Sequence, residues 1–328
     1  MSLLEIRELS VDYRVTSNVV RAVDHVSLSV ERGESLGIAG ESGCGKTSIG
    51  LAVPLLLPKN ASLPTGSITL NGRSIVGMSE EEINQLRWSS VAFVFQGAMN
   101  ALNPVLRIDR QIREAIARHE PDVSKEDANA RVLEMFELVG VSSTRARSFP
   151  HEFSGGMRQR AMIAMALVCR PLLLIADEPT TALDVISQSQ ILALLNRLRR
   201  DQGLSLIMIS HDLAAIKKVC DRVVVMYAGV VVEMGTSQEV LGAGARRPQP
   251  VHPYTKALIS AHPDLRSKRV LAEGLSGHPP DLAMNIVGCR FAERCPSAMP
   301  ICRVTTPETI EVSPGHIAAC HLLTKVRS

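Results

Sequence analysis

The sequence predicts an α/β fold in which a parallel sheet alternates with helices and is interrupted by a helical insertion. Two short, almost entirely apolar runs at residues 172–176 and 204–210 are typical of strands that are buried on both faces of a parallel sheet. Helical patterns alternate with these runs along the chain. Apolar residues make up 45% of the 328 residues and aromatic residues only 3%, so we expect a large aliphatic core.

Local patterns place the remaining elements. The alternation of apolar and polar residues at 3–13 and 19–30 predicts an N-terminal antiparallel pair of strands. Further strands are predicted at 35–39, 67–70 and 91–95, and a hairpin is predicted at 223–227 and 230–234. Residues 79–150 have helical patterns, including an amphipathic segment at 125–139. Two further helices are predicted at 154–170 and 185–200. Ser79 and Glu82 have the spacing of a capping box.

Composition and charge exclude several classes of protein. The net charge of +3 is small, and basic and acidic residues are interspersed, so nothing indicates a nucleic-acid partner. No stretch approaches the ~18 apolar residues of a membrane span. The N-terminus also lacks the basic start and apolar run of a secretory signal. We therefore expect a chain in the reducing cytosol, where its seven cysteines do not form a disulfide framework.

A change in character after about residue 236 predicts two domains. Residues 1–240 would form the α/β domain, with the helical insertion at about 80–165, and residues 241–328 would form a smaller C-terminal extension. Four of the seven cysteines lie in the last forty residues, so this extension is rich in cysteine.

The first functional motif is a glycine-rich loop. Residues 40–47 fit the pattern G-x-x-x-x-G-K-S/T between a buried strand and a helix. Glycines let backbone N–H groups wrap a phosphate, and the helix directs its positive end toward it. Lys46 would contact the β- and γ-phosphates and Thr47 would ligate Mg²⁺; a structural glycine turn is the alternative. The candidate ATP-binding residues of this loop are Gly40, Glu41, Ser42, Gly43, Cys44, Gly45, Lys46, Thr47 and Ser48.

Two carboxylates supply the second part of the predicted site. The apolar strand at 172–176 ends at Asp177 and Glu178, and ligands of open α/β sheets bind at the carboxyl ends of strands. Asp177 would hold Mg²⁺ through its water shell. Glu178 would polarise the attacking water, because phosphoryl transfer depends mainly on a positioned nucleophile.

Residues 153–160, Phe-Ser-Gly-Gly-Met-Arg-Gln-Arg, present a hydroxyl and bare N–H groups at the start of a helix, which suits an anion. Because Ser154 lies at the far end of the helix before Asp177, we expect it to serve the ATP of a second subunit. A simple helix cap is the alternative. The segment resembles the LSGGQ signature of ABC ATPases, with Phe153 and Met157 in place of Leu and Gln. The phosphate contacts of Ser154, Gly155 and Gly156 would remain.

Four further positions agree with this resemblance, which covers residues 3–236. Gln96 resembles the Q-loop residue that contacts Mg²⁺ or water, and His211 resembles the switch histidine that contacts the γ-phosphate. Asp184 resembles the D-loop residue at the dimer interface, and Tyr13 is well placed to stack on adenine. The resemblance implies an ABC-type P-loop ATPase core with an antiparallel β subdomain, in which two chains sandwich two ATP molecules head to tail.

The C-terminal region resembles the tail of ATPases that drive oligopeptide and dipeptide importers, at residues 251–258 and 288–296. Four thiolates could bind zinc or an iron–sulfur cluster, although zinc sites favour C-x₂₋₄-C pairs, which are missing here. Unliganded thiols or disulfides are the third alternative. The resemblance implies a 4Fe–4S cluster on Cys289, Cys295, Cys302 and Cys320.

The expected function is ATP hydrolysis that powers a membrane importer of di- or oligopeptides. Importers of nickel, glutathione or another small solute share the tail and are the alternative. The implied partners are two transmembrane permease subunits, a second ABC ATPase that is a sister chain, and indirectly an extracytoplasmic substrate-binding protein. The protein would lie at the cytoplasmic face of the inner membrane. The cysteine-bearing tail disfavours an exporter, and the single ATPase unit disfavours a soluble ABC protein acting on nucleic acid.

Overall fold

The computed structural model describes residues 2–324 except 17, 98–100, 243–249 and 262–275. The chain forms two compact units, and each is assembled from segments that are distant in the sequence. Unit 1 comprises residues 1–4, 30–35 and 69–209. Unit 2 comprises residues 5–29, 36–68 and 210–328.

Unit 1 contains the parallel strands that the apolar runs predict. The strands are β7 (Val91–Val94), β8 (Leu173–Asp177) and β9 (Ser205–Ile209). β8 pairs in parallel with β7 on one side and with β9 on the other. All ten residues of β8 and β9 are buried, as expected for the centre of an α/β sheet. β8 extends one residue beyond the predicted end because Asp177 still pairs with Ile209.

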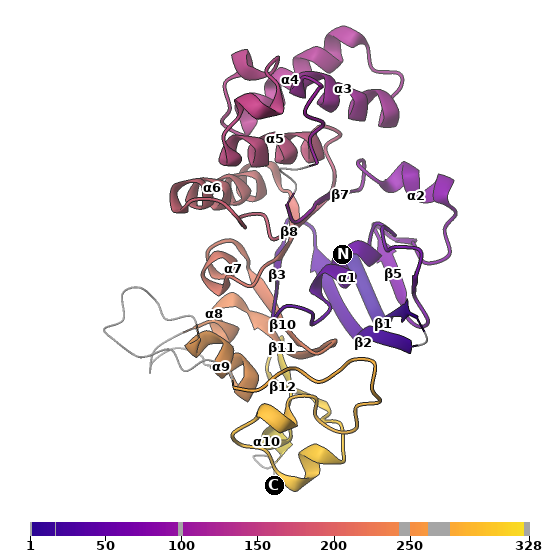
Figure 1. The fold of residues 1–328 in the computed structure, drawn as a ribbon, viewed down its shortest axis with the longest axis vertical. Helices are drawn as coiled ribbons and strands as arrows, with labels where there is room; N and C mark the ends of the chain where they lie inside the picture. Colours follow the sequence, from indigo (N-terminus) through magenta and orange to yellow (C-terminus); the bar gives the residue numbers. More distant parts are fainter. Residues whose placement is uncertain (1, 17, 98–100, 243–249, 262–275, 325–328) are drawn as a thin grey trace. The chain divides into compact units, whose positions relative to one another are not determined.

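Helices make up much of the rest of unit 1. They are α2 (Glu80–Leu86), α3 (Ile108–His119), α4 (Lys125–Leu138), α5 (Gly155–Leu167) and α6 (Val185–Gln202), with 3-10 turns η2 (Ser143–Arg145) and η3 (Pro150–Glu152). The predicted capping box at Ser79 and Glu82 starts α2. In the sequence, α3, α4 and α5 fall between β7 and β8. In space, these three helices pack against one another (Figure 1). α5 ends before the predicted Arg170, which has φ +52°, because the following proline disfavours a helical residue.

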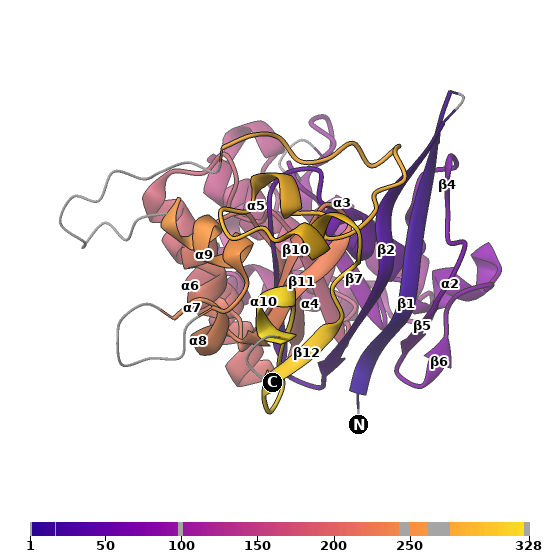
Figure 2. The same ribbon diagram turned by 90° about the horizontal axis from the view of Figure 1, so that it is seen from below.

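Unit 2 contains most of the N-terminal antiparallel strands. β1 (Ser2–Val15) and β2 (Asn18–Glu31) are long neighbouring strands (Figure 2). β4 (Ala61–Ser62) pairs with β1. The short strands β5 (Ser67–Leu70) and β6 (Arg73–Ser74) form an antiparallel pair. The paired residues of these two strands belong to unit 1.

Five neighbouring strands of one sheet, lying mostly in unit 2, link the phosphate loop to the C-terminal region. They are β3 (Ser35–Ala39), β10 (Arg222–Tyr227), β11 (Val230–Thr236), β12 (Thr309–Ser313) and β13 (His316–Ala319). β10 runs parallel to β3 and forms the predicted hairpin with β11. β13 pairs with β11, and β12 with β13, so the C-terminal region extends this sheet. The other elements are α1 (Lys46–Ala52), α7 (Leu213–Val219), α8 (Ser237–Val240), α9 (Pro253–Ser260), α10 (His321–Thr324), η4 (Ala292–Arg294) and η5 (Pro300–Arg303).

Buried polar and aromatic contacts fasten the C-terminal region to β10 and β11. The fully buried Glu233 of β11 accepts hydrogen bonds from the backbone N–H groups of Val251 and His252, and it pairs with His316 of β13 at 2.8 Å. Tyr227, Tyr254 and Phe291 form a buried aromatic cluster with ring centroids 4.6–5.3 Å apart. Such aromatic pairs add to the stability that burial alone provides.

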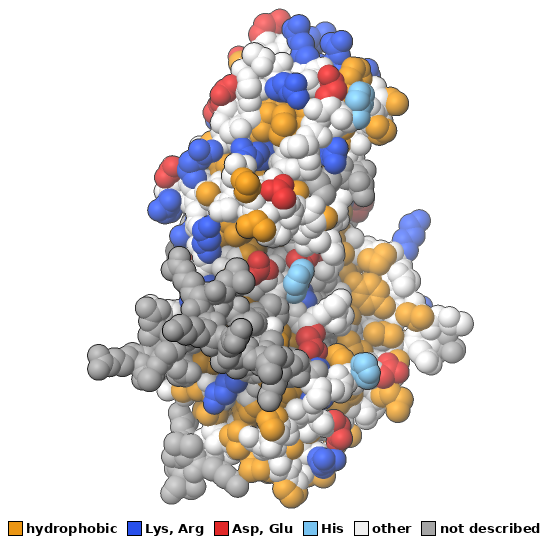
Figure 3. Space-filling view, turned by 60° about the vertical axis from the view of Figure 1, so that its left-hand side comes forward, with side chains coloured by type: hydrophobic (Ala, Val, Ile, Leu, Met, Phe, Trp, Pro, Cys, Tyr) orange, Lys and Arg blue, Asp and Glu red, His pale blue; other side chains and the backbone are white. Residues whose placement is uncertain are grey.

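The described part of the chain has no helix that is both long and apolar enough to cross a membrane. On the face shown in Figure 3, basic and acidic side chains are interspersed over the upper, helical part of the molecule. This agrees with the mixed charge pattern of the sequence.

Candidate active site

The glycine-rich loop connects β3 to α1 and has the backbone that its sequence predicts. Gly40, Gly43 and Gly45 have φ angles of +149°, +79° and +99°, which residues with side chains rarely adopt. A Cβ atom would lie 2.3 Å from the Met226 carbonyl oxygen at Gly40, and 2.2 Å from the Ala22 carbonyl oxygen at Gly45. Only glycine fits at these two positions.

Lys46 lies over the loop and is held by it. Its Nζ donates hydrogen bonds of 2.8 Å to the carbonyl oxygens of both Gly40 and Glu41, and the residue is only 7% exposed. These bonds place the ammonium group beside the loop backbone. A lysine in this position can offer its charge to a phosphate that the loop surrounds.

Tyr13 lies beside the start of α1. Its hydroxyl is 3.0 Å from the Ser48 Oγ, so unit 2 brings it next to the phosphate loop. Stacking of Tyr13 on adenine stays a prediction. His211 also belongs to unit 2 and is exposed just before α7. Its contact with a γ-phosphate likewise stays a prediction.

The two carboxylates follow one another at the carboxyl end of β8. Asp177 is 2% exposed, and Glu178 has a left-handed φ of +49°, a costly conformation for a residue with a side chain. The Glu178 N–H donates to the Ile209 carbonyl oxygen at 2.9 Å, and the Thr181 hydroxyl donates to the Glu178 Oε2 at 3.0 Å. Both the backbone and the carboxylate of Glu178 are therefore fixed by neighbours.

Strand register places Gln96 at the same edge of the sheet. Val94 pairs with Ala176, and each strand leads two residues later to Gln96 and Glu178 respectively. Gln96 is exposed. Unit 1 thus gathers Gln96, Asp177 and Glu178 at the carboxyl ends of two neighbouring parallel strands, where α/β proteins bind ligands.

The signature segment and the D-loop form another part of unit 1. Ser154 caps α5 by accepting a hydrogen bond from the Met157 N–H at 3.3 Å, so the alternative of a helix cap is present in the structure. A Cβ at Gly156 would lie 2.7 Å from the Ser187 Oγ, which shows how closely α5 approaches α6. Ser187 in turn donates from its N–H and its hydroxyl to Asp184, and the backbone bond lowers the pKa of that carboxyl.

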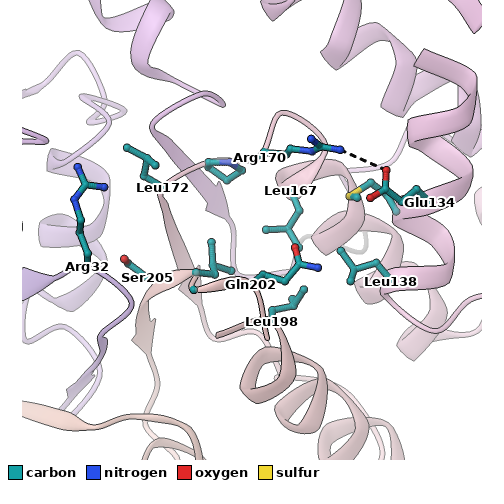
Figure 4. A pocket seen from close by; sticks show the side chains of 13 residues that line it. Arg32, Glu134, Leu138, Leu167, Arg170, Leu172, Leu198, Gln202 and Ser205 are labelled. Atoms are coloured by element: carbon teal, nitrogen blue, oxygen red, sulfur yellow. Dashed lines mark ion pairs between the residues drawn. The ribbon is translucent and has the colours of Figure 1, made fainter. Parts of the chain in front are cut away.

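The hollow shown in Figure 4 lies elsewhere in unit 1. It measures about 470 Å³ and is lined by Glu134 and Leu138 of α4, Leu198 and Gln202 of α6, and residues around the starts of β8 and β9. Arg170 and Glu134 form an ion pair of 3.5 Å at its wall. Because it lies at the amino ends of the strands, it is not the site of Asp177 and Glu178.

Comparisons with known proteins decide the family. Residues 23–181 match the family model described as ABC transporter, and residues 232–302 match the model described as oligopeptide/dipeptide transporter, C-terminal region. The chain is 45% identical to a probable peptide ABC transporter ATP-binding protein of Sinorhizobium fredii, over 97% of this chain and 94% of the relative. It is 44% identical to the oligopeptide transport ATP-binding protein OppD of Escherichia coli, over 97% of this chain and 93% of the relative. The chain belongs to the ABC transporter family of ATP-binding proteins.

A solved structure agrees with the fold. A dimeric ATP-binding cassette in a post-hydrolysis state, bound to ADP and Pi, is 25% identical. It matches 71% of this chain and 98% of its own length with a TM-score of 0.64. As a member of this family, the chain is an ATPase that uses ATP with Mg²⁺.

The 4Fe–4S cluster and metal-binding role predicted for the C-terminal cysteines are wrong. Among the residues that the structure describes, no group of three or more His, Cys, Asp or Glu side chains could hold a metal ion. All four thiols are free in the structure and line one small cavity of about 10 Å³, roughly the space of one water. Burial raises the pKa of Cys289 to about 11 and also raises the pKa values of Cys295 and Cys320. Buried thiols with raised pKa values stay neutral near pH 7 and pack as small apolar side chains.

Sequence reasoning missed the residues of the C-terminal region that contact the phosphate loop. Tyr254 and Arg294 both bind Glu41, more than two hundred positions earlier in the chain. Both residues fall inside the stretches that resemble a peptide-importer tail, but no spacing or periodicity pairs them with the loop. Only the three-dimensional structure reveals this contact.

Proposed function

We infer that this chain is the ATP-hydrolysing subunit of an ABC transporter that imports di- or oligopeptides. This inference rests mainly on the similarity of the whole chain, and of its C-terminal region in particular, to peptide-transport proteins. Full-length relatives at 44–45% identity are named for peptide transport, and residues 232–302 match a C-terminal region named for oligopeptide and dipeptide transporters. The ABC core alone would not distinguish peptides from other cargo.

The proposed roles of the site residues divide binding from chemistry. The loop 40–48 holds the phosphates, with Lys46 on the β- and γ-phosphates and Thr47 and Asp177 on Mg²⁺. Tyr13 stacks on adenine. Glu178 orients the water that attacks the γ-phosphorus; the bond from that phosphorus to the bridging oxygen breaks, and ADP and phosphate leave. Gln96 contacts Mg²⁺ or water, and His211 contacts the γ-phosphate.

A second ATPase subunit, proposed to be a sister chain, completes each site. Ser154, Gly155 and Gly156 would bind the partner's ATP, and Asp184 would lie at the interface. Exposed apolar side chains beside the D-loop support this proposal, because Val185 and Ile186 at the start of α6 are 79% and 72% exposed. Large exposed apolar residues that adjoin functional polar groups often mark interfaces.

The remaining partners follow from the transporter role. We propose two membrane permease subunits, with this chain bound at the cytoplasmic face of the inner membrane and a substrate-binding protein delivering peptide from the other side. Residues 1–240 would act as the ATPase domain and residues 241–328 as the peptide-importer extension that carries the cysteines.

Transport by a reconstituted complex tests this function. The chain would be coexpressed with candidate permease and ATPase subunits from the same genome and placed in proteoliposomes. The vesicles would be supplied with a labelled dipeptide or pentapeptide, binding protein and ATP. We expect ATP-dependent peptide movement that is lost in a matched complex with Lys46→Ala, because the loop then lacks its phosphate-binding charge. ATP-dependent transport of nickel or glutathione but of no peptide would contradict the proposed cargo.

A further inference from the structure

We propose that Arg294 of the C-terminal region is a positioning residue for ATP: it neutralises Glu41 inside the phosphate loop and thereby permits tight nucleotide binding. The proposal rests on the ATP-binding function of the loop. It assigns to the region after residue 240 a direct electrostatic role in that function.

Glu41 and Arg294 form a two-pronged ion pair. The Arg294 Nη1 donates to the Glu41 Oε2 at 2.7 Å, and its Nη2 donates to the Glu41 Oε1 at 2.9 Å. The arginine side chain is 5% exposed and the carboxylate 24%. Paired, planar bonds of this kind are among the strongest and most specific side-chain contacts, and this pair is largely shielded from water.

The guanidinium of Arg294 is itself held in place. Its Nε donates to the Ser276 carbonyl oxygen at 2.9 Å, and its Nη1 donates to the Tyr227 hydroxyl at 3.2 Å. Its central carbon lies 5.6 Å from the centre of the Tyr227 ring, within the range of a cation–π contact. The hydrogen bond with Glu41 raises the pKa of Arg294, so its charge is permanent.

Tyr254 fixes the backbone of the same loop residue. The Glu41 N–H donates to the Tyr254 hydroxyl at 2.9 Å, and Tyr254 is fully buried in the aromatic cluster with Tyr227 and Phe291. The Glu41 carbonyl oxygen accepts a hydrogen bond from Lys46 Nζ. The C-terminal region therefore holds both the side chain and the backbone of a residue that contacts the phosphate-binding lysine.

Electrostatics explain why this pair matters for ATP. A bare carboxylate in a phosphate-binding loop would repel the triphosphate across a partly shielded space. Between the limits of bulk water and a partly shielded site, a single unpaired charge near the phosphates changes affinity on the order of tenfold. Arg294 removes this repulsion without occupying the loop itself.

A double-mutant cycle in the full-length chain tests the proposal, with Mg²⁺–ATP as the probe and calorimetry as the readout. Arg294→Ala should weaken ATP binding on the order of tenfold, because Glu41 is then unpaired. Glu41→Gln in the same chain as Arg294→Ala should recover most of that loss. The Arg294→Ala defect should also shrink in 0.5 M KCl, because salt screens a charge repulsion.

Two variants control for folding. Arg303→Ala removes an exposed ion pair with Glu293 in the same region and should leave ATP affinity unchanged. Arg294→Gln keeps a long polar side chain, so it provides the same cycle if Arg294→Ala does not fold. Rescue by Glu41→Gln is the readout that a merely structural arginine would not give.

Three outcomes would overturn the proposal. If Arg294→Ala cost the same affinity in the otherwise unmodified chain and in the chain that carries Glu41→Gln, the arginine would contact ATP directly or only support the fold. Unchanged affinity in the single variant would mean that the pair is irrelevant to ATP. If the unmodified chain bound no ATP at all, the ATP-binding function would fail as well, which separates the two claims.

Discussion

At the scale of single residues, the sequence pattern explains the glycines of the phosphate loop, whereas other residues of the candidate site are held by partners far along the chain. The φ angles at Gly40 and Gly45 and the close approach of neighbouring carbonyl oxygens explain why the loop pattern requires glycine at those positions. The strained backbone of Glu178 was not predictable, because it depends on a bond to Ile209 of the neighbouring strand. The conformation of a site residue can therefore be predicted from the sequence when a local motif determines it, and not when a distant partner does.

Ser154 tests the proposed role of the signature. Ser154→Arg places a long cation where a partner's phosphate would dock. We expect nearly unchanged ATP affinity of the single subunit and loss of ATP-driven association with a partner ATPase, measured by light scattering. A collapse of the subunit's own ATP affinity would place Ser154 in the same-chain site instead.

The matched control for Ser154→Arg is Ser124→Arg. Ser124 is also an exposed serine cap, and it accepts a hydrogen bond from the Asp127 N–H at the start of α4. Both substitutions remove a cap that stabilises its helix by about 1 kcal/mol. Only the Ser154 variant should fail to associate.

At the scale of elements, those with local signals were predicted and those stabilised by distant partners were not. Buried β8 and β9, the capping box of α2 and the β10–β11 hairpin all follow from local patterns. β12 was missed because its residues are mostly exposed and, among the described strands, it pairs with β13 alone, which joins β11 from far along the chain. The prediction of a 4Fe–4S cluster rested on the resemblance to peptide-importer ATPases, which did not distinguish metal ligands from packed thiols.

His252 gives the start of α9 a dependence on pH. Its Nδ1 accepts a hydrogen bond from the Tyr254 N–H at 3.0 Å, and burial to 1% exposure lowers its pKa from 6.5 to about 4. Because the unfolded chain takes up a proton near pH 6.5 and the folded chain only near pH 4, stability falls as the pH drops through this window. From pH 7 to pH 5 this residue should reduce the free energy of unfolding by about 2 kcal/mol.

His252→Asn should remove that part of the pH dependence, because asparagine caps a helix without titrating. Urea unfolding at pH 7 and pH 5 would measure it, with exposed His151→Asn as the control. Glu233 raises and Lys256 lowers the pKa of His252. Both residues are unchanged in the variant, so their other contributions to stability cancel in the comparison. An identical loss of stability in the His252 variant and the unmodified chain would contradict the assignment.

At the scale of the whole molecule, the sequence predicted the family, but no local pattern predicts which distant segments come together. Each compact unit is made of segments far apart in the sequence, and the C-terminal region joins the sheet that carries the phosphate loop. Contacts such as that between Glu41 and Arg294 arise only from this folding.

The rate of ATP hydrolysis by the assembled transporter, compared between the unmodified complex and one that carries Glu178→Gln, tests the central claim most directly. Glu178→Gln should preserve ATP affinity and trap the closed ATPase dimer, and it should lower turnover by ~10²-fold or more, since the water loses its positioned base. The structure supports a specific effect because Thr181 orients the Glu178 carboxylate. Turnover close to that of the unmodified complex would contradict the assignment of Glu178 to hydrolysis.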